Sequence, residues 1–183
     1  VHASDVDGRR RIVIPNGGTY QIVDTLDHDP DWVLVQRSID SAYLFRLNVN
    51  DGRVRTVATA PLRYGAFLVD HSGELRYAIG MEENRETVTL RRTGDGWTEI
   101  HRSPMGGSTL IPMGFDPDNR LVYTAVSEDG EPAKIFALDA ETDELTLLSG
   151  NDNVEPYSHL YSSDGRELLA VRYLDGLPET DFI

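Results

Sequence analysis

Residues Phe67–Ile79 read FLVDHSGELRYAI, an apolar run, a polar turn and a second apolar run. The same pattern returns in Gly114–Val126, GFDPDNRLVYTAV, and in Leu160–Val171, LYSSDGRELLAV. The turn positions of the three copies are 46 residues apart (119 − 73 and 165 − 119), at Gly73, Asn119 and Gly165. A fixed period of about 40–50 residues with several strands per unit is typical of a β-propeller or a related array. Such a unit cannot bury its own apolar face and must stack on its neighbours.

A second strand–turn–strand pattern falls between the copies of the first. It occurs in Tyr43–Val57 (YLFRLNVNDGRVRTV), Thr89–Ile100 (TLRRTGDGWTEI) and Lys134–Leu148 (KIFALDAETDELTLL). Its turns hold Asp, Gly, Asn and Thr, the residues that tight hairpins require. Two hairpins per period make four strands, which is one propeller blade. The sequence therefore predicts an all-β fold of four-stranded antiparallel blades, with about four blades' worth of chain in a partial or open propeller.

The blade boundaries follow from these repeats. We predict complete blades at about residues 20–61, 62–104 and 105–150, with partial blades at 1–19 and 151–183. The two partial blades could pair and close a four-bladed ring, because propellers have about four to eight blades. Alternatively, the chain is part of a larger propeller, and the open blades at both ends favour this interpretation.

Composition excludes several classes of protein. The formal net charge of −14 opposes binding to the phosphates of nucleic acids. The run Arg9–Arg11 is interpreted as the solvated side of an edge strand. The chain contains no cysteine, so it has neither a disulfide framework nor a thiolate zinc site. No apolar stretch approaches the ~20 residues of a membrane span, and we expect no membrane partner. The compartment, cytoplasmic or periplasmic, stays open.

Few residues suggest catalytic chemistry. The nearest approach to the G-x-S-x-G nucleophile elbow is Gly106–Leu110, GGSTL, which lacks the final glycine and leads into a strand. The histidines show no paired spacing and are expected in structural roles, at His2, His28, His71, His101 and His159. We therefore predict no catalytic residue, no cofactor-binding residue and no metal ligand, and expect this chain not to be an enzyme by itself.

Two acidic clusters have residue types that could form a site. Asp27–Asp31 opens like a calcium loop, but Trp32 stands where the loop needs glycine and Ser38 where it needs glutamate. Carboxylates that cap turn amides explain it without a metal. The pair Glu82-Glu83 is expected in a solvated loop. A role in gripping the amino group of a substrate is the sharper alternative.

Several stretches give the chain a specific resemblance. Gln21–Gln36 (QIVDTLDHDPDWVLVQ), Tyr43–Val57, Phe136–Leu148 and Leu160–Glu179 resemble the propeller of bacterial prolyl oligopeptidase-type serine peptidases. The dipeptidyl and acylaminoacyl peptidase-like branch is the most similar in style. The repeated phrases are shared with other propellers, including TolB-like ones.

The resemblance implies a function for the chain. In that family an N-terminal propeller lies over a C-terminal α/β-hydrolase domain and filters peptides that reach it. The chain would then be a non-catalytic gate, and its partners would be that hydrolase domain and a peptide substrate. The dipeptidyl branch holds the substrate N-terminus with a Glu-Glu pair, which Glu82-Glu83 matches only as a dipeptide.

Two alternatives to the gate stay open. The chain could be a stand-alone or TolB-like propeller that binds a protein partner, or a small lactonase-like propeller enzyme with a central metal. A homodimer through open strand edges is also expected.

Overall fold

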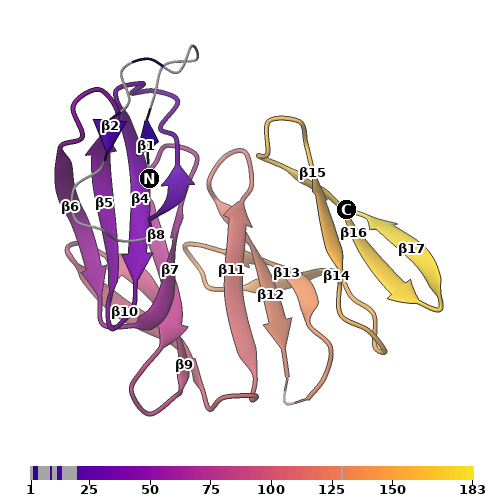
Figure 1. Cartoon of the computed structure of the whole chain (residues 1–183). Coiled ribbons are helices and arrows are strands. Elements are labelled where there is room, and N and C mark those ends of the chain that lie inside the picture. The colour runs from indigo at the N-terminus through magenta and orange to yellow at the C-terminus, as the bar shows by residue number, and fades with distance from the viewer. Residues whose placement is uncertain (1, 4–8, 10–11, 14–19, 129) are drawn as a thin grey trace.

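The computed structural model describes residues 2–3, 9, 12–13, 20–128 and 130–183. These residues form antiparallel sheets that follow one another across the molecule, from the first at the left of Figure 1 to the last at the right. The first blade contains β3 (Gln21–Asp24), β4 (Trp32–Ser38), β5 (Ala42–Asn48) and β6 (Val54–Ala60). The second blade contains β7 (Arg63–Val69), β8 (Leu75–Met81), β9 (Thr87–Thr93) and β10 (Gly96–Ser103).

The third blade contains β11 (Thr109–Phe115), β12 (Leu121–Ser127), β13 (Lys134–Asp139) and β14 (Leu145–Ser149). A fourth sheet has three strands, β15 (Ser158–Tyr161), β16 (Leu168–Asp175) and β17 (Leu177–Phe182). Within each of these sheets the strands pair in chain order, and no helix occurs among the described residues. The prediction of four-stranded antiparallel propeller blades is therefore confirmed.

The chain ends need separate treatment. β1 (His2–Ala3) pairs with β2 (Ile12–Val13), but the predicted partial blade at 1–19 and the Arg9–Arg11 run lie largely outside the described residues. Among the described strands, β17 pairs only with β16. In the part of the chain that the structure describes, no helix is long and apolar enough to cross a membrane.

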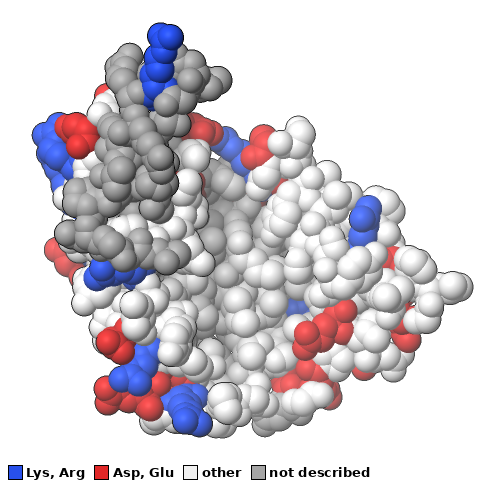
Figure 2. Space-filling view, viewed as in Figure 1, with Lys and Arg blue, Asp and Glu red and all other residues white. Residues whose placement is uncertain are grey.

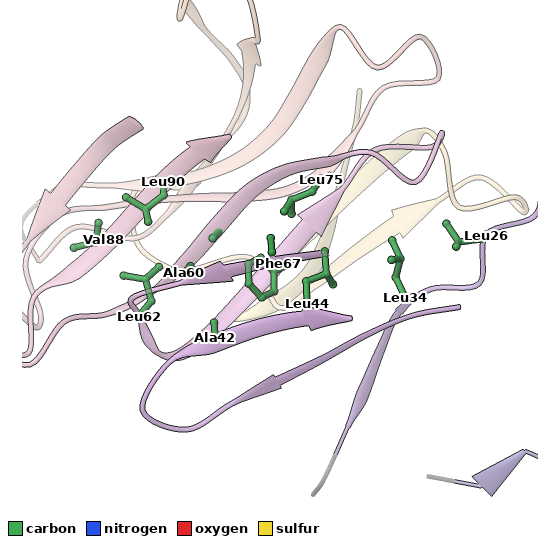
Figure 3. Packing of buried hydrophobic residues seen from close by; sticks show 12 residues of the cluster. Leu26, Leu34, Ala42, Leu44, Ala60, Leu62, Phe67, Leu75, Val88 and Leu90 are labelled. Atoms are coloured by element: carbon green, nitrogen blue, oxygen red, sulfur yellow. The ribbon is translucent and has the colours of Figure 1, made fainter. Parts of the chain in front are cut away.

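Neighbouring blades bury their faces against each other. Figure 3 shows side chains of the first and second blades pointing toward one another, with Leu34 and Leu44 on one side and Phe67 and Leu90 on the other. A second cluster joins the second and third blades through Tyr77, Phe115, Val122 and Leu138. A third joins the third blade to the fourth sheet through Tyr123, Ile135, Leu168, Val171 and Tyr173. Each sheet thus depends on its neighbour for its core, as stacked repeats require.

Two glycines of the second blade allow close packing near its contact with the first blade. A Cβ on Gly80 would lie 2.8 Å from the Cα of Gly65 and 2.8 Å from the Cβ of Leu62, whose side chain is fully buried. A Cβ on Gly65 would lie 2.8 Å from the Cβ of Ala42 in the first blade. Only residues without a side chain allow this close approach of backbones.

One end of the sheets, here called the turn rim, holds the repeated turns. They connect β3–β4, β5–β6, β7–β8, β9–β10, β11–β12, β13–β14 and β15–β16. In the third blade of Figure 1, β11 runs upward into this rim and β12 returns from it. Four capping residues at a spacing of 46 accept a turn amide on a side-chain oxygen: Asp24 from Leu26, Asp70 from Ser72, Asp116 from Arg120, and Ser162 from Glu167. This capping is the physical basis of the sequence period.

The backbone of these turns explains the choice of glycine and asparagine. Gly73, Asn119 and Gly165 have φ of 76°, 59° and 74°. Glycine reaches this left-handed region at no steric cost, and asparagine tolerates it better than most residues.

Asp70 should make stability depend on acid pH. Its carboxylate is 2% exposed and accepts bonds from the Ser72 amide and hydroxyl, the Glu74 amide and Arg76. Burial raises the pKa of this carboxyl, but the bonds to Ser72, Arg76 and the amides outweigh it, so the pKa lies below its usual value. Because the folded-state pKa is the lower one, the stabilisation is present above about pH 4 and is lost as pH falls through the folded-state pKa.

The variant Asp70→Asn keeps the acceptor for the turn amides and loses the charge that faces Arg76. We expect it to lower the free energy of unfolding by about 1 kcal/mol at pH 7, with a difference that shrinks below pH ~4. Urea denaturation at a series of pH values measures this. A difference that stays constant down to pH ~2.5 would show that the Asp70 carboxylate contributes nothing specific.

Candidate functional site

The opposite end of the sheets, here called the loop rim, holds connections that do not repeat. These are residues 39–41, 61–62, 82–86, 104–108, 128–133, 150–157 and 176, of which residue 129 is not described. Loops that vary within a repeated scaffold are where binding residues concentrate.

Exposed apolar side chains gather at the loop rim. Most of those that are large and more than half exposed lie in its connections or within two residues of them: Ile39, Tyr64, Met105, Tyr157, Leu174 and Leu177. No residue in the seven connections of the turn rim, all of them described, is of this kind. The described residues of this kind elsewhere are Ile22 within β3, Leu147 within β14 and Phe182 at the end of β17. The connections of the loop rim therefore carry exposed apolar surface, and the connections of the turn rim do not.

Tyr64 is the most unusual residue of this rim. Its ring is 71% exposed and its φ is +51°, a region that a bulky side chain rarely adopts. The register between β7 and β8 shifts between Arg63 and Ala66, so Tyr64 and Gly65 form a bulge. The bulge amides turn to the first blade: Gly65 N donates to Ser38 Oγ at 2.6 Å and Tyr64 N to Ile39 O at 3.4 Å. The bulge therefore projects the ring of Tyr64 away from the sheet.

Two pockets lie on either side of Tyr64. The first pocket, of about 260 Å³, is lined by Gln21, Gln36, Arg37, Ser38, Tyr64 and Gly65. The second pocket, of about 310 Å³, is lined by Arg63, Tyr64, Met81, Glu82, Glu83, Arg85 and Met105. An exposed aromatic ridge between two concave surfaces is the shape that binds an extended segment of another chain.

The first pocket has a rigid polar floor. Gln36 is 9% exposed; its Oε1 accepts a bond from the Phe67 amide at 2.8 Å, and its Nε2 donates to Gln21 Oε1 at 2.8 Å. The guanidinium of Arg37 lies 5.7 Å from the centre of the Tyr43 ring and has no carboxylate partner among the described residues. The floor is thus fixed by bonds between blades, and a free cation lies at its edge.

Glu82 and Glu83 do not form a free acidic pair. Glu82 is bonded by Arg102, which also contacts Glu86 and Glu99. The hydrogen bonds from Arg102 lower the pKa of Glu82, Glu86 and Glu99, so all three stay ionised around this one cation. Glu83 is exposed and lies 3.4 Å from Arg63. In Figure 2 acidic and basic side chains are mixed in this way at the lower left of the molecule. The pair therefore lies in a charged network and is not set up to grip an amino group.

Two other histidines and the calcium-like stretch are engaged in structural bonds, whereas His159 is not. His101 Nε2 contacts Ser108 O at 3.1 Å, and His71 Nε2 contacts Phe115 O at 3.2 Å, which joins the second and third blades. His159 Nε2 is buried without a partner, and burial lowers the pKa of this imidazole. In the calcium-like stretch, Asp29 pairs with Arg46 and Asp31 accepts from Asn50. Within the described residues, no group of three or more His, Asp or Glu side chains could hold a metal ion.

Comparison with known proteins indicates the fold. No known protein family matches the sequence, and no curated protein matches it. The structure is similar to TolB from Acinetobacter baumannii, with a TM-score of 0.60 and 12% identity over 98% of this chain and 44% of that one. A proposed 6-phosphogluconolactonase from Bacteroides uniformis aligns with a TM-score of 0.45 and 13% identity over 98% of this chain and 62% of that one. The chain spans less than half of the TolB chain that it matches.

At 12% identity, the similarity to TolB agrees with an all-β, propeller-like fold and concerns the fold alone. The resemblance to prolyl oligopeptidase-type peptidases finds no support in these comparisons. Of the propellers to which the sequence was likened, the structure resembles TolB, in fold.

Proposed function

We propose that this chain is a protein-binding propeller module whose loop rim holds a partner protein, and that it performs no catalysis itself. The observation that carries the proposal is the strained, exposed Tyr64 between two pockets, on the rim where the exposed apolar side chains gather. The similarity to the TolB propeller agrees with a binding role but supplies only the fold.

The composition of the rim supports a protein partner. Tyrosine, methionine and arginine are enriched in protein interfaces, and the two pockets bring together Tyr64, Met105 and arginines of both blades. The arginines are Arg37, Arg63 and Arg85. Backbone strain of this kind costs of order 1–3 kcal/mol and persists where the surrounding structure enforces it, commonly at binding sites. An exposed tyrosine ring adds no packing to the folded core, so its strained position is not explained by stability.

Photocrosslinking from the two rims tests the proposal. Tyr64→p-benzoylphenylalanine places a photoreactive aromatic group on the loop rim, and Asp118→p-benzoylphenylalanine places the same group at an exposed position on the turn rim. In the producing cell we expect one discrete adduct with another protein from position 64 and none from position 118. Purified partner should then form the same adduct.

Equal labelling from both rims, or none from position 64, would contradict the proposal. A crosslink from position 64 to another domain of the same polypeptide would instead favour the gate hypothesis, in which a hydrolase domain lies against the propeller.

A further inference from the structure

Among the described residues that line it, the first pocket has hydrogen-bond donors without a protein partner. Apart from the Tyr64 hydroxyl, every side-chain acceptor among these residues already accepts a bond. We infer that the first pocket binds a carboxylate of the partner, from an acidic side chain or a chain terminus, with an adjacent apolar side chain against Tyr64. The inference rests on the proposed function, because it names the chemistry by which the loop rim would recognise its partner.

The orientation of the two glutamines follows from one backbone amide. Phe67 N can only donate, so the atom of Gln36 that faces it at 2.8 Å must be the oxygen. The other end of Gln36 is then its amide nitrogen, which donates to Gln21 at 2.8 Å. The Gln21 atom in that bond must be Oε1, so its Nε2 is left as a donor with no protein partner among the described residues.

Ser38 is oriented by the same logic. Its Oγ accepts a bond from Gly65 N at 2.6 Å, and its hydroxyl, which can also donate, makes no such bond to another described residue. Arg37 adds a guanidinium that lies on the Tyr43 ring and pairs with no carboxylate there. Gln21, Arg37 and Ser38 therefore bring three donors to the lining of one pocket, and none of the three has an acceptor among the described residues.

A carboxylate is the ligand that satisfies these donors. It accepts several bonds at once, and arginine binds it in a planar, bidentate geometry. A cationic group would face Arg37 and find no free carboxylate among the residues that line the pocket. The net charge of −14 repels anions at long range, so recognition must come from these contacts at short distance. The volume of about 260 Å³ accommodates a carboxylate and part of the adjoining residue.

Two matched pairs of blocked peptides test the inference and separate the two sources of carboxylate. Acetyl-Gly-Phe with a free C-terminus is compared with acetyl-Gly-Phe-amide, and acetyl-Phe-Asp-amide with acetyl-Phe-Asn-amide. Binding is measured by NMR from the backbone amide of Gly65 and the side-chain amide of Gln21. We expect the charged member of at least one pair to bind about tenfold more tightly than its neutral partner.

Three variants test whether the preference for the charged peptides arises in the first pocket. Arg37→Gln should abolish the preference for charge, whereas Arg166→Gln removes the same charge at an exposed turn-rim position and should preserve it. Gln21→Glu keeps the acceptor for Gln36 but replaces the free donor by a carboxylate, and should abolish binding of the charged peptides. This third variant decides the matter if Arg37→Gln does not fold.

Equal affinity within both pairs, or no binding of any peptide at about 10 mM, overturns the inference. So does a charge preference that survives both Arg37→Gln and Gln21→Glu. If position 64 crosslinks a partner but the peptides show no charge preference, the proposed function stands and the carboxylate site fails. If the peptides bind as expected but position 64 captures no protein, the site stands and the partner proposal fails.

Discussion

Replacing Gly80 by alanine should lower the free energy of unfolding by about 1–3 kcal/mol, the range for overpacking a well-packed core. The new Cβ would lie 2.8 Å from Gly65 Cα, 2.8 Å from Leu62 Cβ and 3.0 Å from Arg63 O. Two of these atoms belong to backbone and the third sits at the root of a side chain, so none can move without shifting β7 or the link between blades. Urea denaturation followed through Trp32 and Trp97 measures the change, which corresponds to about 2–4 °C in Tm per kcal/mol.

Gly96→Ala is the matched control in the same blade. Its Cβ would meet only Thr93 O, at 3.7 Å, which is an ordinary contact. We expect this variant to stay within about 0.5 kcal/mol of the native protein. If the two variants are equally stable, the packing of the first blade on the second does not depend on the absence of a side chain at position 80.

Tyr64→Gly should change stability and binding in opposite directions. Glycine adopts a φ of +51° without steric cost, so the variant should gain up to about 1 kcal/mol in the free energy of unfolding. Loss of the ring should weaken binding to the partner captured at this position by about 30-fold or more, as for an aromatic hot spot. Denaturation and titration with purified partner measure the two effects.

Tyr157→Gly provides the comparison, since Tyr157 is also exposed on the loop rim but is not in the left-handed region. It should not gain stability. If Tyr64 serves folding and not binding, Tyr64→Gly will lower the free energy of unfolding and leave the affinity for the partner unchanged. That result would contradict the prediction.

The blades could be predicted from the sequence because the residues that form their hairpin turns recur in it. Asp70 and Asp116 cap turn amides with their own side chains, and Gly73 and Asn119 supply the left-handed backbone, so the repeat marks each hairpin directly. The alternation of apolar residues then gives the buried faces. These features depend on neighbours close in sequence, which is why they can be read from it.

The candidate site could not be read in the same way. Gln36 and Ser38 of β4 reach across to amides of β7, a contact between blades that no local pattern reports. One signal of the site was present in the sequence. Tyr64-Gly65 of the second blade corresponds, 46 residues later, to Leu110-Ile111 of the third blade, so this pair departs from the repeat. The role of Arg102 was missed for the same reason, because Glu82, Glu86 and Glu99 converge on it from three segments.

The predicted homodimer through open edges stays a proposal, and β17 bears on it. This strand is exposed along its length, yet Pro178 offers no amide, and Glu179 and Asp181 add negative charge. Proline and charge are the means by which exposed strands avoid pairing with other chains. Self-association through this edge is therefore expected to be weak.

The capped turns also bear on how such an array can lengthen. The first hairpin of each of the four sheets closes on a side-chain oxygen that it carries itself, so a duplicated blade brings this closure with it. Duplication of a blade adds a unit with its turn rim already formed. The connections of the loop rim do not repeat and can change in sequence independently. Gene duplication can therefore lengthen the array of blades, while the sequence of the loop rim changes independently.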